Sequence, residues 1–132
     1  MTTTTLLNEF RALKPGNHIC LIYENEYEWQ EAVSAFLISG LEKNEKCICM
    51  IKNHTPEQIW QYLQARGVDI NSDDIKRQLL IISINSWAEL KNSLNPETIT
   101  ALLGRESLQA RSEGYVSLRF TGEIGWMLGH SP

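Results

Sequence analysis

Apolar residues follow two different spacings along this chain, and the spacing changes several times. Four short apolar runs, bounded by turn-forming residues, predict buried strands at residues 18–23, 46–51, 79–84 and 115–120. Between the first two runs, apolar residues recur every three or four positions, which predicts a helix. The stripe of this helix contains Trp29, Val33, Phe36, Leu37, Gly40 and Leu41.

Helix boundaries are marked by residues whose local chemistry favours them. Thr55 can accept a hydrogen bond from the backbone N–H of Gln58, and Pro56 suits the first helical position because its missing N–H costs nothing there. Gly67 can end that helix in the left-handed conformation. Another helix begins near Pro96. Its apolar face carries Ile99, Leu102, Leu103 and Ala110.

Strands that alternate with helices predict a single α/β domain over residues 1–132. We expect a parallel sheet of about four strands with helices on both faces, a three-layer arrangement, because strands buried on both sides are near-continuous apolar runs. With 132 residues, of which 42% are hydrophobic, the chain is long enough to bury one core.

Composition and charge exclude several classes of protein. The net charge is −4 without a basic stripe, so we expect no direct nucleic-acid binding. The longest apolar runs are too short to cross a bilayer, and the N-terminus lacks the regions of a secretion signal. The three cysteines lie in apolar runs and fit reduced thiols of a cytoplasmic protein. The charged run at residues 42–46 is most simply interpreted as a solvated helix end.

In an open parallel sheet, ligands bind beyond the carboxyl ends of the strands. That rule selects residues 23–24, 52–54, 85–87 and 121–123, with Trp126 shortly after the last segment. Together they supply carboxylates, hydroxyls, one imidazole and two indoles, which suit a small-molecule pocket with apolar walls and a few polar anchors. We assign no catalytic residue and expect binding without catalysis.

Nucleotide hydrolysis conflicts with the loop that follows the first predicted strand. A phosphate-binding loop needs glycines and a lysine, whose N–H groups and charge surround the phosphates. Residues 24–28 contain no glycine and three carboxylates, and this charge would repel a triphosphate.

Histidine and cysteine side chains allow a metal site, but a structural role explains them as well. His18 and Cys20 share one face of a strand, as do Cys47 and Cys49, because strand side chains repeat every second residue. Zinc sites are usually built from cysteine pairs in turns, and buried cysteine commonly acts as a small hydrophobic residue. We assign no metal ligand and keep both roles open for His18 and Cys20.

Two groups of residues resemble the motifs of a sensory domain. The first opens with residues 18–24 and continues through Glu28, Trp29, Phe36, Leu37, Gly40, Leu41, Glu42, Glu45, Lys46 and Cys47. The second comprises Gly114, Tyr115, Leu118, Arg119, Thr121, Gly122, Glu123 and Trp126. In order and identity they resemble the MEDS domain of signalling proteins from methanogens and methylotrophs, which also occurs in a dichloromethane-responsive repressor.

The resemblance implies a core related to RecA and KaiC without the phosphate-binding loop, and a strand order of 1-4-3-2. It implies an input domain for signal transduction or transcription regulation that senses small hydrocarbon derivatives without a cofactor. The signal would pass to an output domain such as a histidine kinase or a DNA-binding domain. With the strand-end rule, the implied ligand-binding residues are His18, Cys20, Tyr23, Glu24, Arg119, Thr121, Gly122, Glu123 and Trp126.

Two alternatives stay open: an enzyme on the same core that uses Glu123 or Cys20, and a protein–protein regulatory domain without a small ligand. The family usually continues with another strand after the second motif, so we expect that the chain is truncated at its C-terminus. Without that strand, residues 18–23 would form an exposed apolar edge, which invites pairing with another chain. We therefore expect a homodimer formed near the first strand.

Overall fold

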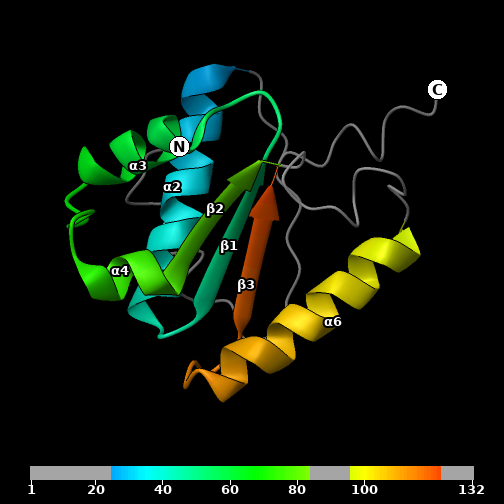
Figure 1. The fold of residues 1–132 in the computed structure, drawn as a ribbon. Helices are drawn as coiled ribbons and strands as arrows, with labels where there is room; N and C mark the ends of the chain where they lie inside the picture. Colours follow the sequence, from blue (N-terminus) through cyan, green and yellow to red (C-terminus); the bar gives the residue numbers. More distant parts are fainter. Residues whose placement is uncertain (1–24, 84–95, 123–132) are drawn as a thin grey trace.

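Helices and strands alternate along the chain in the computed structural model, which describes residues 25–83 and 96–122 (Figure 1). The predicted α/β fold with a parallel sheet is confirmed. The described elements, in chain order, are α2 (Glu26–Glu42), β1 (Lys46–Ile51), α3 (Pro56–Gln64), α4 (Asp73–Gln78), β2 (Leu79–Ser83), α6 (Pro96–Ser112) and β3 (Leu118–Gly122).

The strand β1 lies between β2 and β3, and both pairs are parallel. The expected order placed the strand at 46–51 at an edge and the strands at 79–84 and 115–120 side by side, and this part of the prediction is wrong. The last five residues of β1 are all buried, whereas β2 is buried only at its first residue. The central position suits the most buried strand, because it hides both faces and pairs both edges.

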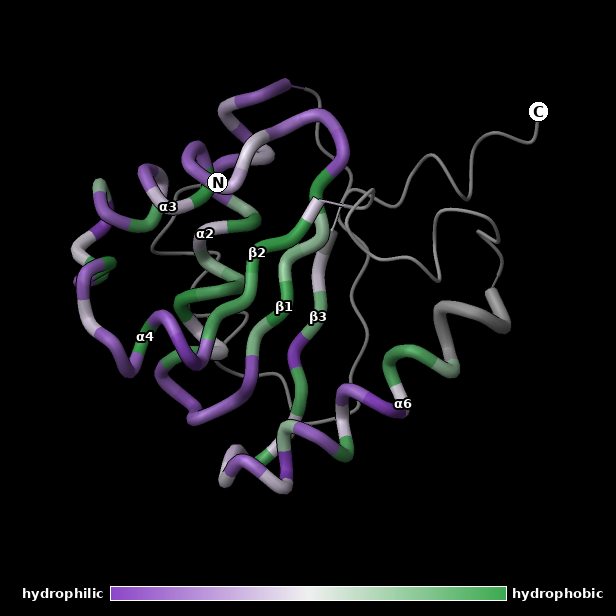
Figure 2. Tube along the Cα trace, viewed as in Figure 1, coloured by the Kyte–Doolittle hydropathy of each residue, from purple (hydrophilic) through white to green (hydrophobic). Residues whose placement is uncertain are grey.

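Side chains of β1 point alternately to two buried faces of the sheet. Cys47, Cys49 and Ile51 face one way, and Ile48 and Met50 face the other; all five are buried. Figure 2 shows apolar residues concentrated along the strands, with hydrophilic residues in α4 and in the turn before β1. The core on the first face is completed by residues of α2, α3 and β2, namely Trp29, Val33, Leu37, Ile59, Leu63 and Leu79.

Helices cover the sheet from both faces. The chain moves from β1 to β2 in one direction and returns past β1 to β3 in the other. Because crossovers between parallel strands are right-handed, these opposite directions place α3 and α6 on opposite faces. The helix α6 buries Leu102 and Ala110 and lies beside β3, on the side away from α3 and α4 (Figure 1).

The start of α3 has the predicted capping. The N–H of Gln58 donates to the hydroxyl of Thr55 (3.2 Å), and the side-chain oxygen of Gln58 accepts from the N–H of Thr55 (2.8 Å). Pro56 is the first helical residue. Gly67, two residues after the C-cap of α3, adopts a φ of 95°, the left-handed conformation expected for it.

The strand β3 begins three residues later than expected. The first predicted residues belong to the connection from α6: Val116 is 59% exposed, and its N–H donates to the carbonyl oxygen of Asn44 (3.0 Å). Pairing with β1 starts at Leu118. Thr121 and Gly122 are therefore the last residues of the strand instead of the first residues beyond it.

The short helix α4 was not predicted. Its N-cap is Ser72, whose hydroxyl accepts from the N–H of Ile75 (3.4 Å), and Asp73 and Asp74 lie in the first turn, where carboxylates are favourable. Six residues are too few to show a helical period, so the hydrophobic pattern gives no signal here.

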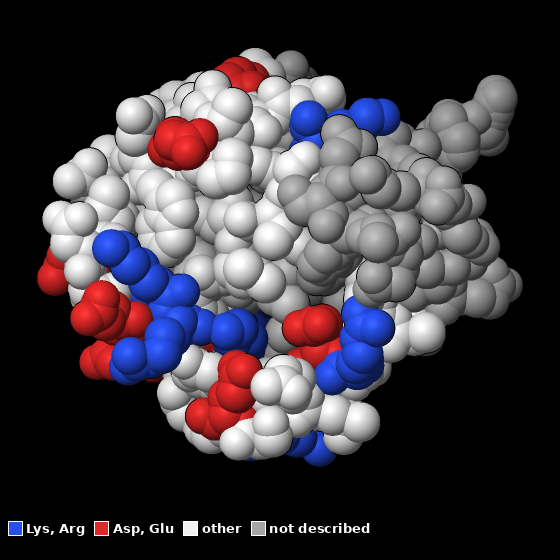
Figure 3. All heavy atoms as spheres, in the orientation of Figure 1, with Lys and Arg blue, Asp and Glu red and all other residues white. Residues whose placement is uncertain are grey.

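Charged residues of both signs are mixed on the surface. On the face shown in Figure 3, basic and acidic side chains lie next to one another around the lower part of the molecule. Arg77 pairs with Asp74, and Lys46 lies 3.5 Å from a carboxylate oxygen of Glu113. None of the helices in the described part of the chain has the length and apolar character that crossing a membrane requires.

Candidate functional site

Four side chains from three elements meet near the carboxyl end of β1. Glu26 and Trp29 belong to the start of α2, His54 to the loop after β1, and Tyr62 to α3. The Nε2 atom of His54 lies 2.8 Å and 3.0 Å from the two carboxylate oxygens of Glu26, and the hydroxyl of Tyr62 donates to the same carboxylate at 3.1 Å. This carboxylate therefore joins three elements. We call the four residues the Glu26 cluster.

Trp29 is the buried member of the Glu26 cluster. Its ring stacks on the imidazole of His54, with 4.0 Å between the ring centroids and 11° between the planes. The ring of Tyr62 meets it edge-on at 6.3 Å. Trp29 is 6% exposed and belongs to the core, as its helical stripe predicted, whereas the side chain of Glu26 is 55% exposed. The cluster thus combines a buried aromatic ring with a carboxylate that solvent can reach.

The hydroxyl of Tyr62 acts as a donor to Glu26. Burial raises the pKa of this hydroxyl, and its hydrogen bond to the carboxylate of Glu26 raises the pKa further. Tyr62 is held in turn by Arg66, which donates to its carbonyl oxygen at 2.9 Å and pairs with the buried carboxylate of Glu31 on α2. The contacts of Tyr62 with Glu26 and of Arg66 with Glu31 therefore link α3 and the turn after it to α2.

The amino end of α2 is capped by the side chain of Asn25. The side-chain oxygen of Asn25 accepts from the N–H of Glu28 (2.9 Å), and Glu26 and Glu28 lie in the first turn. A helix N-terminus attracts anions through its free N–H groups and its dipole, but here a carboxamide and two carboxylates already occupy that position.

Two of the predicted ligand-binding residues lie at the same edge of the sheet. Thr121 and Gly122 end β3, where they pair with Cys49 and Met50 of β1. Further predicted ligand-binding residues lie outside the described residues, and their role stays a prediction: His18, Cys20, Tyr23, Glu24, Glu123 and Trp126, together with residues 85–87.

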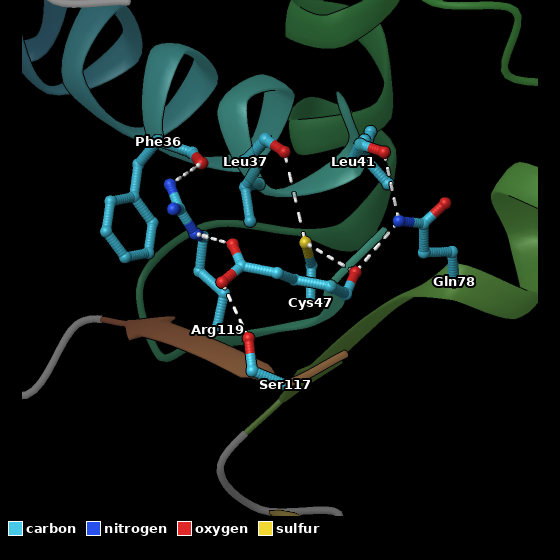
Figure 4. A network of polar contacts seen from close by, with 8 residues as sticks. Phe36, Leu37, Leu41, Cys47, Gln78, Ser117 and Arg119 are labelled. Atoms are coloured by element: carbon cyan, nitrogen blue, oxygen red, sulfur yellow. Dashed lines mark hydrogen bonds and ion pairs between the residues drawn. The ribbon is translucent and has the colours of Figure 1, made fainter. Parts of the chain in front are cut away.

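Arg119, also predicted to bind a ligand, lies near the amino end of β3 and is engaged within the protein (Figure 4). Its side chain is 4% exposed. Its Nε donates to a carboxylate oxygen of Glu45 at 2.7 Å, and its Nη1 donates to the carbonyl oxygen of Phe36 at 3.1 Å. The guanidinium also lies over the ring of Phe36, 4.8 Å from its centroid. Contact with a ligand stays a prediction for this residue.

Glu45 is the centre of a buried polar network, and its partners Gln78, Ser117 and Arg119 are labelled in Figure 4. Ser117 donates to its second carboxylate oxygen at 2.7 Å, and Gln78 donates to its backbone carbonyl oxygen at 2.9 Å. Glu45 is 4% exposed, so the interpretation of residues 42–46 as a solvated helix end is wrong for this residue. A carboxylate can be buried here because Arg119 neutralises it and Ser117 satisfies its other oxygen.

The two described cysteines lie in the core. Cys47 and Cys49 are free thiols and fully buried, as expected for small hydrophobic residues. The thiol of Cys47 lies 3.5 Å from the carbonyl oxygen of Glu45, and burial raises its pKa to about 12. Among the residues that the structure describes, no group of three His, Cys, Asp or Glu side chains could hold a metal ion.

Sequence reasoning selected His54 through the strand-end rule but missed its partners. Glu26 was interpreted only as part of an acidic loop, and Tyr62 was not singled out. The spacing of Glu26 and Trp29 carries a partial signal, because residues three apart share one face of a helix. Tyr62 carries none, since its place beside Glu26 depends on how α3 packs against α2.

Comparison with known proteins gives one family. The family model for the MEDS domain, described as the methanogen/methylotroph, DcmR sensory domain, matches residues 17–132. No match was found among curated proteins or among solved structures. The matched range includes both groups of residues that carry the resemblance, and it includes the Glu26 cluster.

Proposed function

Because the chain belongs to the MEDS family of sensory domains, we propose that it binds a small molecule at the carboxyl edge of its sheet and serves as an input domain for signal transduction. The observation that carries this proposal is the Glu26 cluster. It supplies aromatic surface and polar anchors at the place where open parallel sheets bind their ligands.

The family resemblance favours a small hydrocarbon derivative as the ligand, with an output domain such as a histidine kinase or a DNA-binding domain as the recipient of the signal. The stacked rings of Trp29 and His54 support an apolar ligand, and Glu26 supports one that carries a polar group. Cys47 and Cys49 are buried, and buried thiols are inert, so we assign neither of them a role as a nucleophile.

A ligand screen tests the proposal. Native mass spectrometry of the purified chain would reveal a retained small molecule, and thermal shift against small alcohols, amines and halogenated hydrocarbons would identify further ligands. For a ligand so found, we expect Glu26→Gln to weaken binding about tenfold, as for the loss of a charge-assisted hydrogen bond.

Glu57→Gln is the matched control, because Glu57 is an exposed carboxylate in the first turn of the neighbouring helix α3. It should bind the ligand as the unmodified chain does. A ligand that binds both variants equally well occupies another site, and a chain that neither retains nor binds any of these compounds would contradict the sensory role.

A further inference from the structure

Glu26 differs from the other carboxylates that anchor this fold. Each of those pairs with a lysine or arginine side chain: Glu31 with Arg66, Glu45 with Arg119, and Glu113 with Lys46. In the described part of the chain, the carboxylate of Glu26 contacts His54 and Tyr62 instead, and neither carries a fixed positive charge. Its negative charge therefore lacks a permanent counter-charge among the described residues.

The surroundings of this carboxylate are aromatic on several sides. The rings of His54 and Tyr62 carry the groups that hydrogen-bond to it, and Trp29 stacks on the ring of His54 and meets the ring of Tyr62 edge-on. A carboxylate without a lysine or arginine partner attracts cations, and the aromatic rings beside it offer apolar surface to the alkyl groups of an organic cation. Anions are disfavoured, since Glu28 adds a second carboxylate in the same turn and Asn25 caps the helix.

We propose that the Glu26 cluster binds a small organic ammonium ion. This inference rests on the proposed sensory function and names the chemical class of its ligand. An N–H group of the ion donates to Glu26 in place of the hydroxyl of Tyr62, while its alkyl groups lie against the rings of His54 and Tyr62. Because Glu26 joins α2 to α3 and to the β1–α3 loop, the exchange of donors loosens the link between these elements.

Three probes of nearly the same shape separate charge from apolar contact. tert-Butylammonium is a cation, tert-butanol is neutral, and trimethylacetate is an anion. In titrations followed by the amide signals of the chain in NMR, we expect tert-butylammonium to shift the signals of residues 26–29, 52–55 and 62. tert-Butanol should bind about tenfold more weakly there, and trimethylacetate should leave these signals unchanged.

Variants then test the role of each group. Glu26→Gln should weaken the binding of tert-butylammonium about tenfold, and the control Glu57→Gln should leave it unchanged. Tyr62→Phe removes the donor that the ion replaces, so it should bind tert-butylammonium more tightly than the unmodified chain does. Weaker binding to Tyr62→Phe would overturn the exchange of donors.

Other outcomes distinguish this inference from the function on which it rests. If tert-butanol binds the cluster as well as tert-butylammonium does, the ligand class is wrong but the site and the sensory function stand. If tert-butylammonium shifts none of these signals while a neutral compound from the screen does, the same conclusion holds. If no compound shifts them, both the ligand class and the site are wrong.

Discussion

Glu26 and Glu45 carry the same side chain near the two ends of α2, in different surroundings. Glu45 is 4% exposed and is neutralised by Arg119, so its interactions are confined to the protein. The side chain of Glu26 is 55% exposed and has hydrogen bonds to two aromatic side chains. A hydrophobic pattern cannot separate these roles, because both residues are charged positions at the limits of one helical stripe. The difference comes from what the strands and α3 place beside them.

At the scale of single residues, the buried pair gives a test of stability. Arg119→Met keeps much of the apolar stem but leaves Glu45 buried without a counter-charge, so we expect the free energy of unfolding to fall by about 3–5 kcal/mol. Urea denaturation followed by circular dichroism measures the change.

The control for this prediction is Arg77→Met, since Arg77 and Asp74 form an exposed pair. That variant should lose less than about 1 kcal/mol. Similar small losses in both variants would show that the pair of Glu45 and Arg119 does not stabilise the fold as its burial indicates.

At the scale of elements, α2 packs closely against the sheet at Gly40, a position without a side chain. A Cβ atom added at Gly40 would lie 2.6 Å from both the Cδ of Arg119 and the Sγ of Cys47. The helix approaches β1 and β3 this closely only because position 40 is glycine. Its stripe of apolar residues predicted which face of α2 is buried, but not that the contact includes a charged side chain.

Two glycine substitutions separate this contact from helix propensity. Gly40→Ala should destabilise the protein by about 1–3 kcal/mol, because the methyl group overpacks the interface. Gly104→Ala, in α6, meets nothing within 4 Å and should stabilise it by about 0.5–1 kcal/mol. Thermal and urea denaturation of both variants would decide, and a gain of stability in Gly40→Ala would refute the tight packing.

The elements that could be predicted from the sequence are those with local signals. The cap at Thr55 and the apolar runs of β1 and β2 depend on neighbouring residues, and both predictions are confirmed. The start of β3 at Leu118 and the short helix α4 were missed, because the first depends on pairing with Lys46 and the second has no period. Strand order is a property of the whole sheet, and the order inferred by analogy is wrong.

At the scale of the whole molecule, the position of the candidate site was easier to predict than its members. The rule that ligands bind at the carboxyl ends of parallel strands selected His54, and the structure brings Glu26, Trp29 and Tyr62 to it. The relation to a RecA core and the homodimer formed near residues 18–23 stay predictions.

The charge at the amino end of α2 predicts how the molecule responds to nucleotides. Asn25 caps α2, and Glu26 and Glu28 follow in its first turn, where a triphosphate would have to bind. We therefore expect no binding of Mg-ATP in the micromolar range by titration calorimetry. A micromolar dissociation constant would contradict this reading of the helix end.

The close contact at Gly40 also determines how α2 can move. The backbone packs there directly against Arg119 and Cys47, so a small tilt of α2 that keeps this contact would turn about Gly40. Glu26 lies about 21 Å away along the axis, at 1.5 Å for each residue. Such a tilt would displace the exposed residue Glu26 much further than it displaces Gly40.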